Sequence, residues 1–231
     1  MQTLKLFWKK FRVLPSAWLL LVQLALLILA VFTYSDSEYR ALTWSLGVLA
    51  LLIIAKVIRQ TPVFTFWGLF FVVGAFAFSI LIFAGYDNKT IQITAYSFEA
   101  LAYFYAAYGL LRYMFADRYL TKDELFAAGA VFTLIAWAFA FLYSICQLLL
   151  PNSFQNPNNP QELQRWLDLL FLSFSLQSAT GLSDLLPIRP AARVLAMLQM
   201  FCGVMYLAVI VSRLIALQYI PHSNAQSTDK E

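Results

Sequence analysis

The chain has 231 residues, of which 61% are apolar and only 12% are charged. Soluble domains are about half apolar and carry charge on about a quarter of their residues, so this composition excludes an ordinary soluble protein. The net charge of +4 does not indicate nucleic-acid binding, because the basic residues gather in the loops and termini expected in the cytoplasm. We therefore expect an all-α protein whose mass lies mostly in a lipid bilayer.

The sequence offers no set of residues for catalysis or for a bound metal. Its single histidine, His222, lies in a polar tail, and Cys146 and Cys202 fall in apolar segments, where cysteine behaves as a small hydrophobic residue. The sequence contains no Gly-rich phosphate loop and no Cys or His cluster with ligand spacing. We predict that the protein is not an enzyme and uses no cofactor.

We expect residues 1–15 to be an amphipathic segment on the cytoplasmic side. Apolar side chains share one face of the expected helix and basic side chains lie opposite or beside them, namely Leu4, Phe7, Trp8, Phe11 and Leu14 against Lys5, Lys9 and Arg12. This pattern fits a helix at the lipid interface, and it fits equally a basic flank that holds the N-terminus inside. The next apolar run is long for a signal peptide and lacks a small-residue cleavage site, so we expect it to be retained.

Six apolar segments are long enough to cross a membrane, which takes about 17–25 residues. In chain order they are 16–33, 41–58, 62–84, 91–115, 125–150 and 191–220. Of the 16 lysines and arginines, five lie on one side, and the remaining eleven lie on the side of both termini; the five are Arg40, Lys89, Arg165, Arg189 and Arg193. The positive-inside rule places both termini, including the tail 221–231, in the cytoplasm of a cell-membrane protein.

The first four spans, within residues 16–124, form a peripheral domain in this layout. A voltage sensor needs a ladder of arginines in its fourth helix, but span 91–115 contains Arg112 as its one basic residue, so we expect little voltage gating. The same span contains Glu99, with Tyr96 and Tyr103 within reach on one helical face. Glu99 is either a sensor for protons or a ligand, or a partner in a structural hydrogen bond between helices.

Between the fifth and sixth spans lies a segment too short to cross the bilayer. A Pro/Asn-rich outer loop at 151–160 leads into a helix expected to start near Asn159 and to continue through Trp166. The apolar run 167–174 is followed by Gly181 and Asp184. The segment therefore has the shape of a re-entrant loop, and non-helical backbone at membrane depth is tolerated only where protein buries it or where it lines a watery path.

Residues 166–214 resemble the pore module of the potassium-channel superfamily. The family's filter reads Thr-Thr-Val-Gly-Tyr-Gly-Asp-x-x-Pro, and this chain reads, without a gap, Ser178, Ala179, Thr180, Gly181, Leu182, Ser183, Asp184, Leu185, Leu186 and Pro187. Gly203 follows Gly181 at an interval similar to the family's filter-to-hinge interval. The resemblance implies a pore domain at 125–220, and a homotetramer whose four filter loops surround a permeant monovalent cation such as K⁺ or Na⁺.

The same resemblance suggests roles for residues around the filter. Gly203 matches the gating hinge, although a small residue also permits close helix packing. Gln199, Tyr206 and Ile210 share a face expected to line the inner pore, and Gln199 is alternatively placed to bond the back of the pore helix. Asp184 lies at the outer mouth, where a carboxylate concentrates cations, or it braces the filter by a hydrogen bond.

Three departures from the family's filter bear on ion selectivity. Ala179 replaces a threonine whose hydroxyl completes the innermost site, and Leu182 replaces a tyrosine that braces the filter. Ser183 replaces a glycine at a position expected to be left-handed, where a side chain costs about 1–2 kcal/mol. We therefore expect a cation channel with weak or altered potassium selectivity. The alternatives are a non-conducting or regulatory channel-like subunit, and a proton-coupled transporter that uses Glu99.

Overall fold

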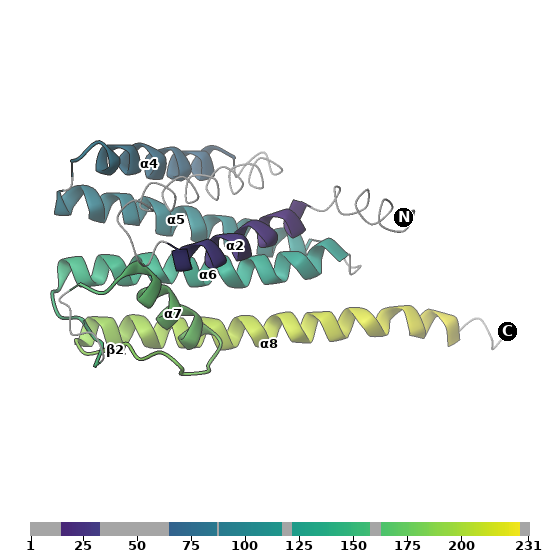
Figure 1. The fold of residues 1–231 in the computed structure, drawn as a ribbon. Coiled ribbons are helices and arrows are strands. Elements are labelled where there is room, and N and C mark those ends of the chain that lie inside the picture. The colour runs from purple at the N-terminus through teal and green to yellow at the C-terminus, as the bar shows by residue number, and fades with distance from the viewer. Residues whose placement is uncertain (1–14, 33–64, 87, 117–121, 158–162, 227–231) are drawn as a thin grey trace.

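The computed structural model describes residues 15–32, 65–86, 88–116, 122–157 and 163–226. Helices dominate this part of the chain (Figure 1), which confirms the predicted all-α class. They are α2 (Pro15–Phe32), α4 (Thr65–Phe83), α5 (Lys89–Met114), α6 (Lys122–Leu149), α7 (Trp166–Gln177) and α8 (Pro190–Gln226). Two short strands, β1 (Phe154–Gln155) and β2 (Leu186–Pro187), pair antiparallel outside the helices.

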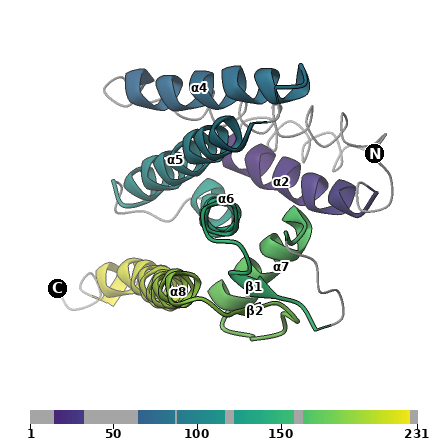
Figure 2. The ribbon, with the colours of Figure 1, turned by 90° about the vertical axis from the view of Figure 1, so that its left-hand side faces the viewer.

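Helix α6 lies at the centre of the bundle and contacts α2, α5, α7 and α8 (Figure 2). Its sequence is apolar on every side, as a helix surrounded by other helices requires. Small side chains let the neighbouring backbones approach closely. The fully buried ones on α6 are Ala127, Ala130, Ala136, Ala138 and Ala140, and those on α5 include Ala95, Ala102 and Ala106.

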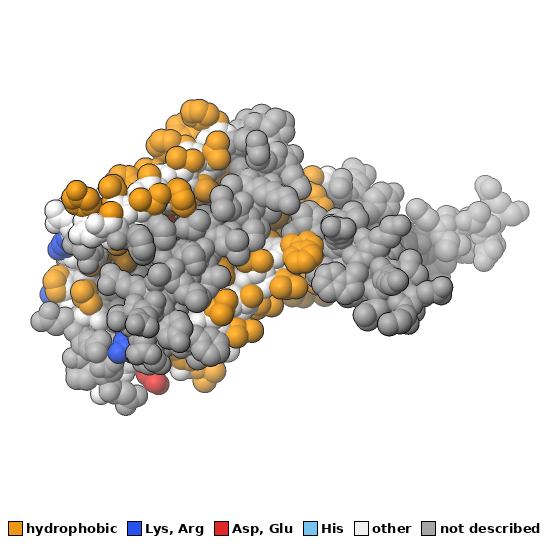
Figure 3. Space-filling view, turned by 45° about the horizontal axis from the view of Figure 1, so that its top comes forward, with side chains coloured by type: hydrophobic (Ala, Val, Ile, Leu, Met, Phe, Trp, Pro, Cys, Tyr) orange, Lys and Arg blue, Asp and Glu red, His pale blue; other side chains and the backbone are white. Residues whose placement is uncertain are grey.

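Helix α4 lies at the edge of the bundle and packs against α5 (Figures 1 and 2). Gly74 permits this packing, because a Cβ there would lie 2.5 Å from the Phe98 ring. The opposite side of α4 is apolar and exposed, with Phe66 at 75% and Trp67 at 57%. Figure 3 shows hydrophobic side chains across this face of the molecule. Such a surface suits contact with lipid tails.

Helix α8 buries one narrow stripe against the bundle and exposes the rest of its apolar surface. The buried positions repeat every three or four residues, as one helical face requires, and they are Ala192, Ala196, Gln199, Gly203, Tyr206 and Ile210. Exposed apolar side chains surround this stripe, including Met197, Phe201 and Val204. Lipid or other protein chains must cover them, because a continuous apolar surface of this kind is unstable in water.

Within the described residues, two helices are long and apolar enough to cross a membrane, over Asp123–Leu149 and Pro190–Ala216. They match the predicted fifth and sixth spans. Helices α2, α4 and α5 cover the first, third and fourth predicted spans. Ser16–Ala30 and Phe66–Ile82 are apolar but shorter. The six-span layout stays a prediction, because segment 1–14 and the second span, 41–58, lie outside the described residues.

One predicted boundary is wrong. Residues 163–165 are not helical and α7 begins at Trp166 with Arg165 at its N-cap, so no continuous helix runs into it from Asn159. This boundary was missed because the entry to α7 is set by a distant side chain of α6, described below. Helix α8 continues to Gln226, past residue 220, where the last span is predicted to end.

Candidate functional site

A side chain of α6 fixes the entry to the short helix α7. The amide of buried Gln147 accepts a hydrogen bond from the Gln164 N–H (2.9 Å) and donates one to the Gln164 carbonyl (3.1 Å). Trp166 then packs its ring edge-on against Trp137 of α6, with centroids 5.4 Å apart. With 12 residues, α7 is about 18 Å long, too short for a hydrocarbon core of about 30 Å.

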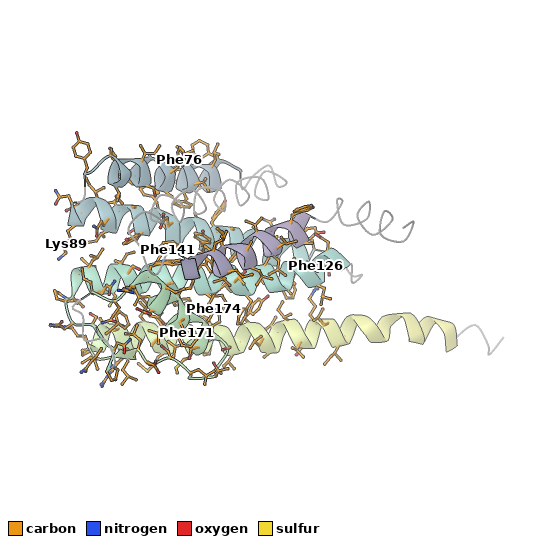
Figure 4. The ribbon with its side chains drawn as sticks, in the orientation of Figure 1. Phe76, Lys89, Phe126, Phe141, Phe171 and Phe174 are labelled. Atoms are coloured by element: carbon orange, nitrogen blue, oxygen red, sulfur yellow. The ribbon has the colours of Figure 1, made fainter. Side chains whose placement is uncertain are left out.

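The C-terminal end of α7 leads directly into residues 178–187, which align with the family's filter and are called the filter segment below. Ser178 caps this end, since its N–H donates to the Phe174 carbonyl (2.9 Å) and its hydroxyl donates to the same oxygen (2.7 Å). Phe174, which is labelled in Figure 4, lies on α7. It packs against Phe132 of α6, with ring centroids 6.1 Å apart. The partial negative charge of a helix C-terminus favours a cation nearby.

The filter backbone folds back onto Ser175 of α7. The Ser175 carbonyl accepts hydrogen bonds from the N–H groups of Thr180 (3.1 Å) and Gly181 (3.4 Å), and its hydroxyl accepts one from the Ser183 N–H (3.2 Å). In a trans peptide unit the carbonyl points opposite to the N–H, and the described residues contain no cis bond. The carbonyls that precede these N–H groups, those of Ala179, Thr180 and Leu182, therefore point away from α7.

Two left-handed residues alternate with ordinary ones along this segment. Ala179 has φ of 58° and Gly181 has φ of 66°. Alternating handedness turns successive carbonyls toward one side, which an ordinary strand does not do. Ser183 stands where the family's second glycine is left-handed, but it is not among the described residues with positive φ. Its hydroxyl instead accepts a hydrogen bond from the Leu185 N–H (3.1 Å).

The side chains of the filter segment contribute little oxygen toward the exposed side. Ala179 has none, and the Thr180 hydroxyl lies 3.0 Å from the Ser178 hydroxyl and 3.4 Å from the Ser175 carbonyl, at the end of α7. Leu182 is 70% exposed. Asp184 is exposed as well, and within the described residues nothing bonds its carboxylate. An open carboxylate of this kind can attract cations.

The outer loop after α6 holds the far end of the filter segment. Phe154 pairs with Pro187, and Gln155 pairs with Leu186. The carbonyl of fully buried Ser153 accepts a hydrogen bond from the Ile188 N–H (2.8 Å). The filter segment is therefore anchored at both ends, by α7 before it and by the outer loop after it.

The three residues predicted to line an inner pore are buried within the chain. Gln199 is fully buried against α7, and Tyr206 donates its hydroxyl to the Ala128 carbonyl of α6 (2.5 Å). Ile210 is 6% exposed in the same core. A side chain that lines a path shared between chains must be exposed in a single chain, so this lining prediction is wrong. Helix α8 is apolar on all sides, and its sequence therefore does not identify the face that packs inward.

Gly203 lies where α8 passes closest to α7. A Cβ at this position would lie 2.8 Å from the Gln177 Cα and nearer still to the Gln177 carbonyl oxygen. Close packing through a small residue was one of the two interpretations of Gly203, and this contact supports it. The hinge role stays a prediction.

Glu99 lies on α5, and its partner on α4 is Ser79. The Ser79 hydroxyl donates to a Glu99 carboxylate oxygen over 3.3 Å. The sequence did not indicate this partner, because the two residues belong to different helices and the expected neighbours were Tyr96 and Tyr103. The bond is of the interhelical kind that the structural interpretation of Glu99 requires. Its sensor role stays a prediction.

A second charged contact joins α8 to α5 and α6 and was not predicted. The Arg213 guanidinium donates to the Met114 carbonyl at the end of α5, and it lies 3.7 Å from the carboxylate of buried Glu124 on α6. Its Cζ also lies 4.6 Å from the centre of the Phe115 ring. A cation is favoured at a helix C-terminus and over an aromatic face. The signal in the sequence was Arg213 itself, a charged residue that follows a long apolar run of the last helix.

A family model described as "Ion channel" matches residues 129–218. The match begins in α6, includes α7 and the filter segment, and ends in α8. It lies inside the pore domain predicted at 125–220. No curated protein and no solved structure matches the chain.

Proposed function

We propose that this chain, whose residues 129–218 are an ion-channel pore module of the potassium-channel superfamily, is one subunit of a homotetrameric cation channel in the cell membrane. Its two ends lie in the cytoplasm in this proposal. The domain before the pore module is peripheral to the conduction path and carries little voltage sensitivity. The channel conducts monovalent cations such as K⁺ or Na⁺ passively and needs no cofactor.

The observation that carries the proposal is the orientation of the filter backbone. The carbonyls of Ala179, Thr180 and Leu182 face away from α7, because the N–H groups that follow them bond to Ser175. Rings of backbone carbonyls replace the hydration shell of a cation in potassium filters. One chain supplies one strand of such a ring, so the proposal requires four chains around an axis. The exposure of Leu182 in the single chain fits a strand that neighbouring chains surround.

The same segment supports weak or altered potassium selectivity. Ala179 offers no hydroxyl at the inner end, and the Thr180 hydroxyl lies against the end of α7. The left-handed residues are Ala179 and Gly181, whereas the family pattern places glycines at the positions of Gly181 and Ser183. The carbonyl spacing therefore differs from that of a standard potassium filter, and the coordination of K⁺ changes with it.

The test is the reversal potential of the purified chain in planar bilayers, with potassium chloride on one side and sodium chloride on the other. We expect single-channel currents, a small reversal potential and a weakly voltage-dependent open probability. A strongly potassium-selective reversal potential contradicts the selectivity part of the proposal. A steep conductance–voltage curve with several gating charges contradicts the gating part, because the fourth predicted span, 91–115, offers no arginine ladder.

A non-conducting or regulatory channel-like subunit is the second candidate. Leu182 and Ser183 favour it, since they replace the bracing tyrosine and the second glycine of the family's filter. This candidate predicts no current from the purified chain and altered current when the chain is combined with a conducting partner subunit. Single-channel recording of the chain alone separates the two candidates.

A further inference from the structure

A buried polar cluster joins α7, the pore helix of the proposed channel, to α6 and α8. It consists of Tyr143 on α6, Ser173 and Gln177 on α7, and Gln199 on α8. Gln199, Ser173, Gln177 and Tyr143 are each completely buried in this otherwise apolar part of the bundle. Buried polar groups are costly unless each finds a partner, so the bonds within this cluster specify how the three helices fit together.

Gln199 lies at the centre of the cluster and bonds to both other helices. Its carbonyl oxygen accepts a hydrogen bond from the Tyr143 hydroxyl (2.5 Å). Its amide nitrogen has two N–H donors and lies within hydrogen-bond distance of three acceptors, the Ser173 carbonyl (3.0 Å), the Ser173 hydroxyl (2.5 Å) and the Gln177 side-chain oxygen (3.3 Å). Both ends of one side chain are therefore used, and a shorter or apolar residue cannot replace them.

The α7 members of the cluster also form hydrogen bonds to α6. The Ser173 hydroxyl donates to the Ala136 carbonyl (2.6 Å), and the Gln177 amide donates to the Phe132 carbonyl (2.7 Å). Donors and acceptors thus form one consistent chain, in which every polar group of Gln199 and Gln177 has a partner. Networks of this kind act as a unit in a low-dielectric interior.

The cluster acts on the last turn of α7, immediately before the filter. Gln177 is the final residue of α7, and Ser178 follows it as the cap. Gly203, one turn after Gln199, packs on the backbone of the same Gln177. Helix α8 therefore holds the end of the pore helix at two points, one polar and one steric. A displacement of α8 relative to α6 must move Gln177 and the Ser175 groups that orient the filter carbonyls.

We propose that Gln199 is a positioning residue that couples α8 to the filter, so that the Tyr143–Gln199–Ser173 bonds set the ion selectivity of the filter strand. The inference rests on the proposed function, because it assigns a control element to the same conduction site. Gln199 touches no permeant ion in this arrangement. It acts through Ser173 and Gln177 on the backbone that follows them.

The matched variants are Tyr143→Phe and Ser144→Ala. Each removes one buried hydroxyl from adjacent positions of α6, but the Tyr143 hydroxyl reaches Gln199, whereas the Ser144 hydroxyl bonds to the Ala140 carbonyl within its own helix. Gln199→Met is the third variant, since it keeps the length of the side chain and removes its hydrogen bonds. The purified full-length chain is studied in bilayers of phosphatidylethanolamine and phosphatidylglycerol.

Two readouts are compared, the K⁺/Na⁺ permeability ratio and the amide hydrogen exchange of the peptide covering residues 178–185. We expect Tyr143→Phe and Gln199→Met to change the permeability ratio by about threefold or more and to speed exchange in that peptide. We expect Ser144→Ala to change neither the permeability ratio nor the exchange rate. This holds even if Ser144→Ala lowers the melting temperature as much as Tyr143→Phe does.

The proposal is overturned if Tyr143→Phe matches Ser144→Ala in both readouts. If the unmodified chain passes no current, the proposed function fails, and hydrogen exchange alone decides the coupling. Faster exchange in Tyr143→Phe than in Ser144→Ala then supports the coupling of α8 to the filter segment, and equal exchange overturns it. Tyr143→Phe keeps this test decisive if Gln199→Met does not fold.

Discussion

The backbone of Gly203 in the middle of α8 packs directly on the backbone of Gln177, the last residue of α7. A Cβ at position 203 would lie 2.8 Å from the Gln177 Cα. Because backbone atoms cannot move aside as a flexible side chain can, this contact requires a residue without a side chain. The spacing between the pore helix and the last helix is thus fixed at one point.

The first prediction concerns this contact. We expect Gly203→Ala to destabilise the chain by about 1–3 kcal/mol, because the added methyl group has no space. Gly109→Ala on α5 is the matched control, since nothing lies within 4 Å of a Cβ there, and a Gly to Ala change in a helix stabilises it by about 0.5–1 kcal/mol. Thermal unfolding in detergent measures both. Equal melting temperatures for the two variants would show that the contact does not constrain Gly203.

The second prediction concerns the left-handed Ala179. A left-handed alanine costs about 1–2 kcal/mol of folding free energy, and glycine removes this cost. Glycine also has more conformational freedom in the unfolded chain, which destabilises the folded state by about 0.5–1 kcal/mol. We expect Ala179→Gly to stabilise the protein by about 0.5–1 kcal/mol. The control is Ala77→Gly, at an exposed position inside α4, which should lose about 1 kcal/mol. A loss of stability in Ala179→Gly would contradict the assigned backbone conformation.

The third prediction concerns the filter sequence. The double variant Leu182→Tyr with Ser183→Gly brings two positions back to the family pattern. We expect its K⁺/Na⁺ permeability ratio to rise at least about tenfold over that of the natural chain, because the tyrosine restores a brace and the glycine permits a left-handed backbone at position 183. Reversal potentials under sodium and potassium gradients measure the ratio. The single variant Leu182→Ala is the control, since it changes the same position without adding a brace.

The fourth prediction concerns Glu99 as a sensor. Glu99→Gln keeps an oxygen that can accept the Ser79 hydrogen bond and removes the group that titrates. We therefore expect the variant to fold normally and its open probability to lose its dependence on pH. Recording currents over a pH series tests this, with Ser79→Ala as the variant that removes the bond and keeps the carboxylate. A pH response that survives in Glu99→Gln leaves only the structural role.

The fifth prediction concerns the contact between Arg213 and Glu124. We expect Glu124→Gln to destabilise the chain by about 1–3 kcal/mol, because it removes the charge that faces a largely buried arginine. The loss stays below that of a fully buried pair, since Arg213 is 15% exposed and keeps the Met114 carbonyl and the Phe115 ring. Arg213→Lys keeps the charge but loses the planar contact with the ring, so we expect a smaller loss. Urea or thermal unfolding measures the difference.

Features that depend on segment length and local motif could be predicted from the sequence. The helical class, a short helix over the apolar run 167–174 and the filter segment around Gly181 follow from apolar run lengths and from the order of residues in the motif. The position of α6 as the central helix was not predicted. Its composition indicates only that it is apolar on every side, which a helix surrounded by lipid also satisfies.

Features that depend on contacts between distant segments could not be predicted. The inward face of α8 was misassigned because its apolar residues show no preferred side, and the Tyr206–Ala128 bond that orients it joins residues 78 positions apart. The Ser79–Glu99 and Arg213–Glu124 contacts likewise join separate helices. The left-handed backbone of Ala179 was not predicted either, because it is set by the hydrogen bonds of the following residues to Ser175 and not by a preference of alanine.

The bonds that shape the filter segment come from its own immediate neighbourhood. Thr180 and Ser183 bond to Ser175, which precedes them by five and eight positions. Contacts of such short sequence separation form early and close only small loops. Each newly made chain can therefore fold its filter segment on its own, and assembly of the proposed homotetramer would join segments that are already folded. Under that proposal, a folding defect at Ser175 would appear in single chains, whereas a defect in the exposed face of α8 would appear only when chains associate.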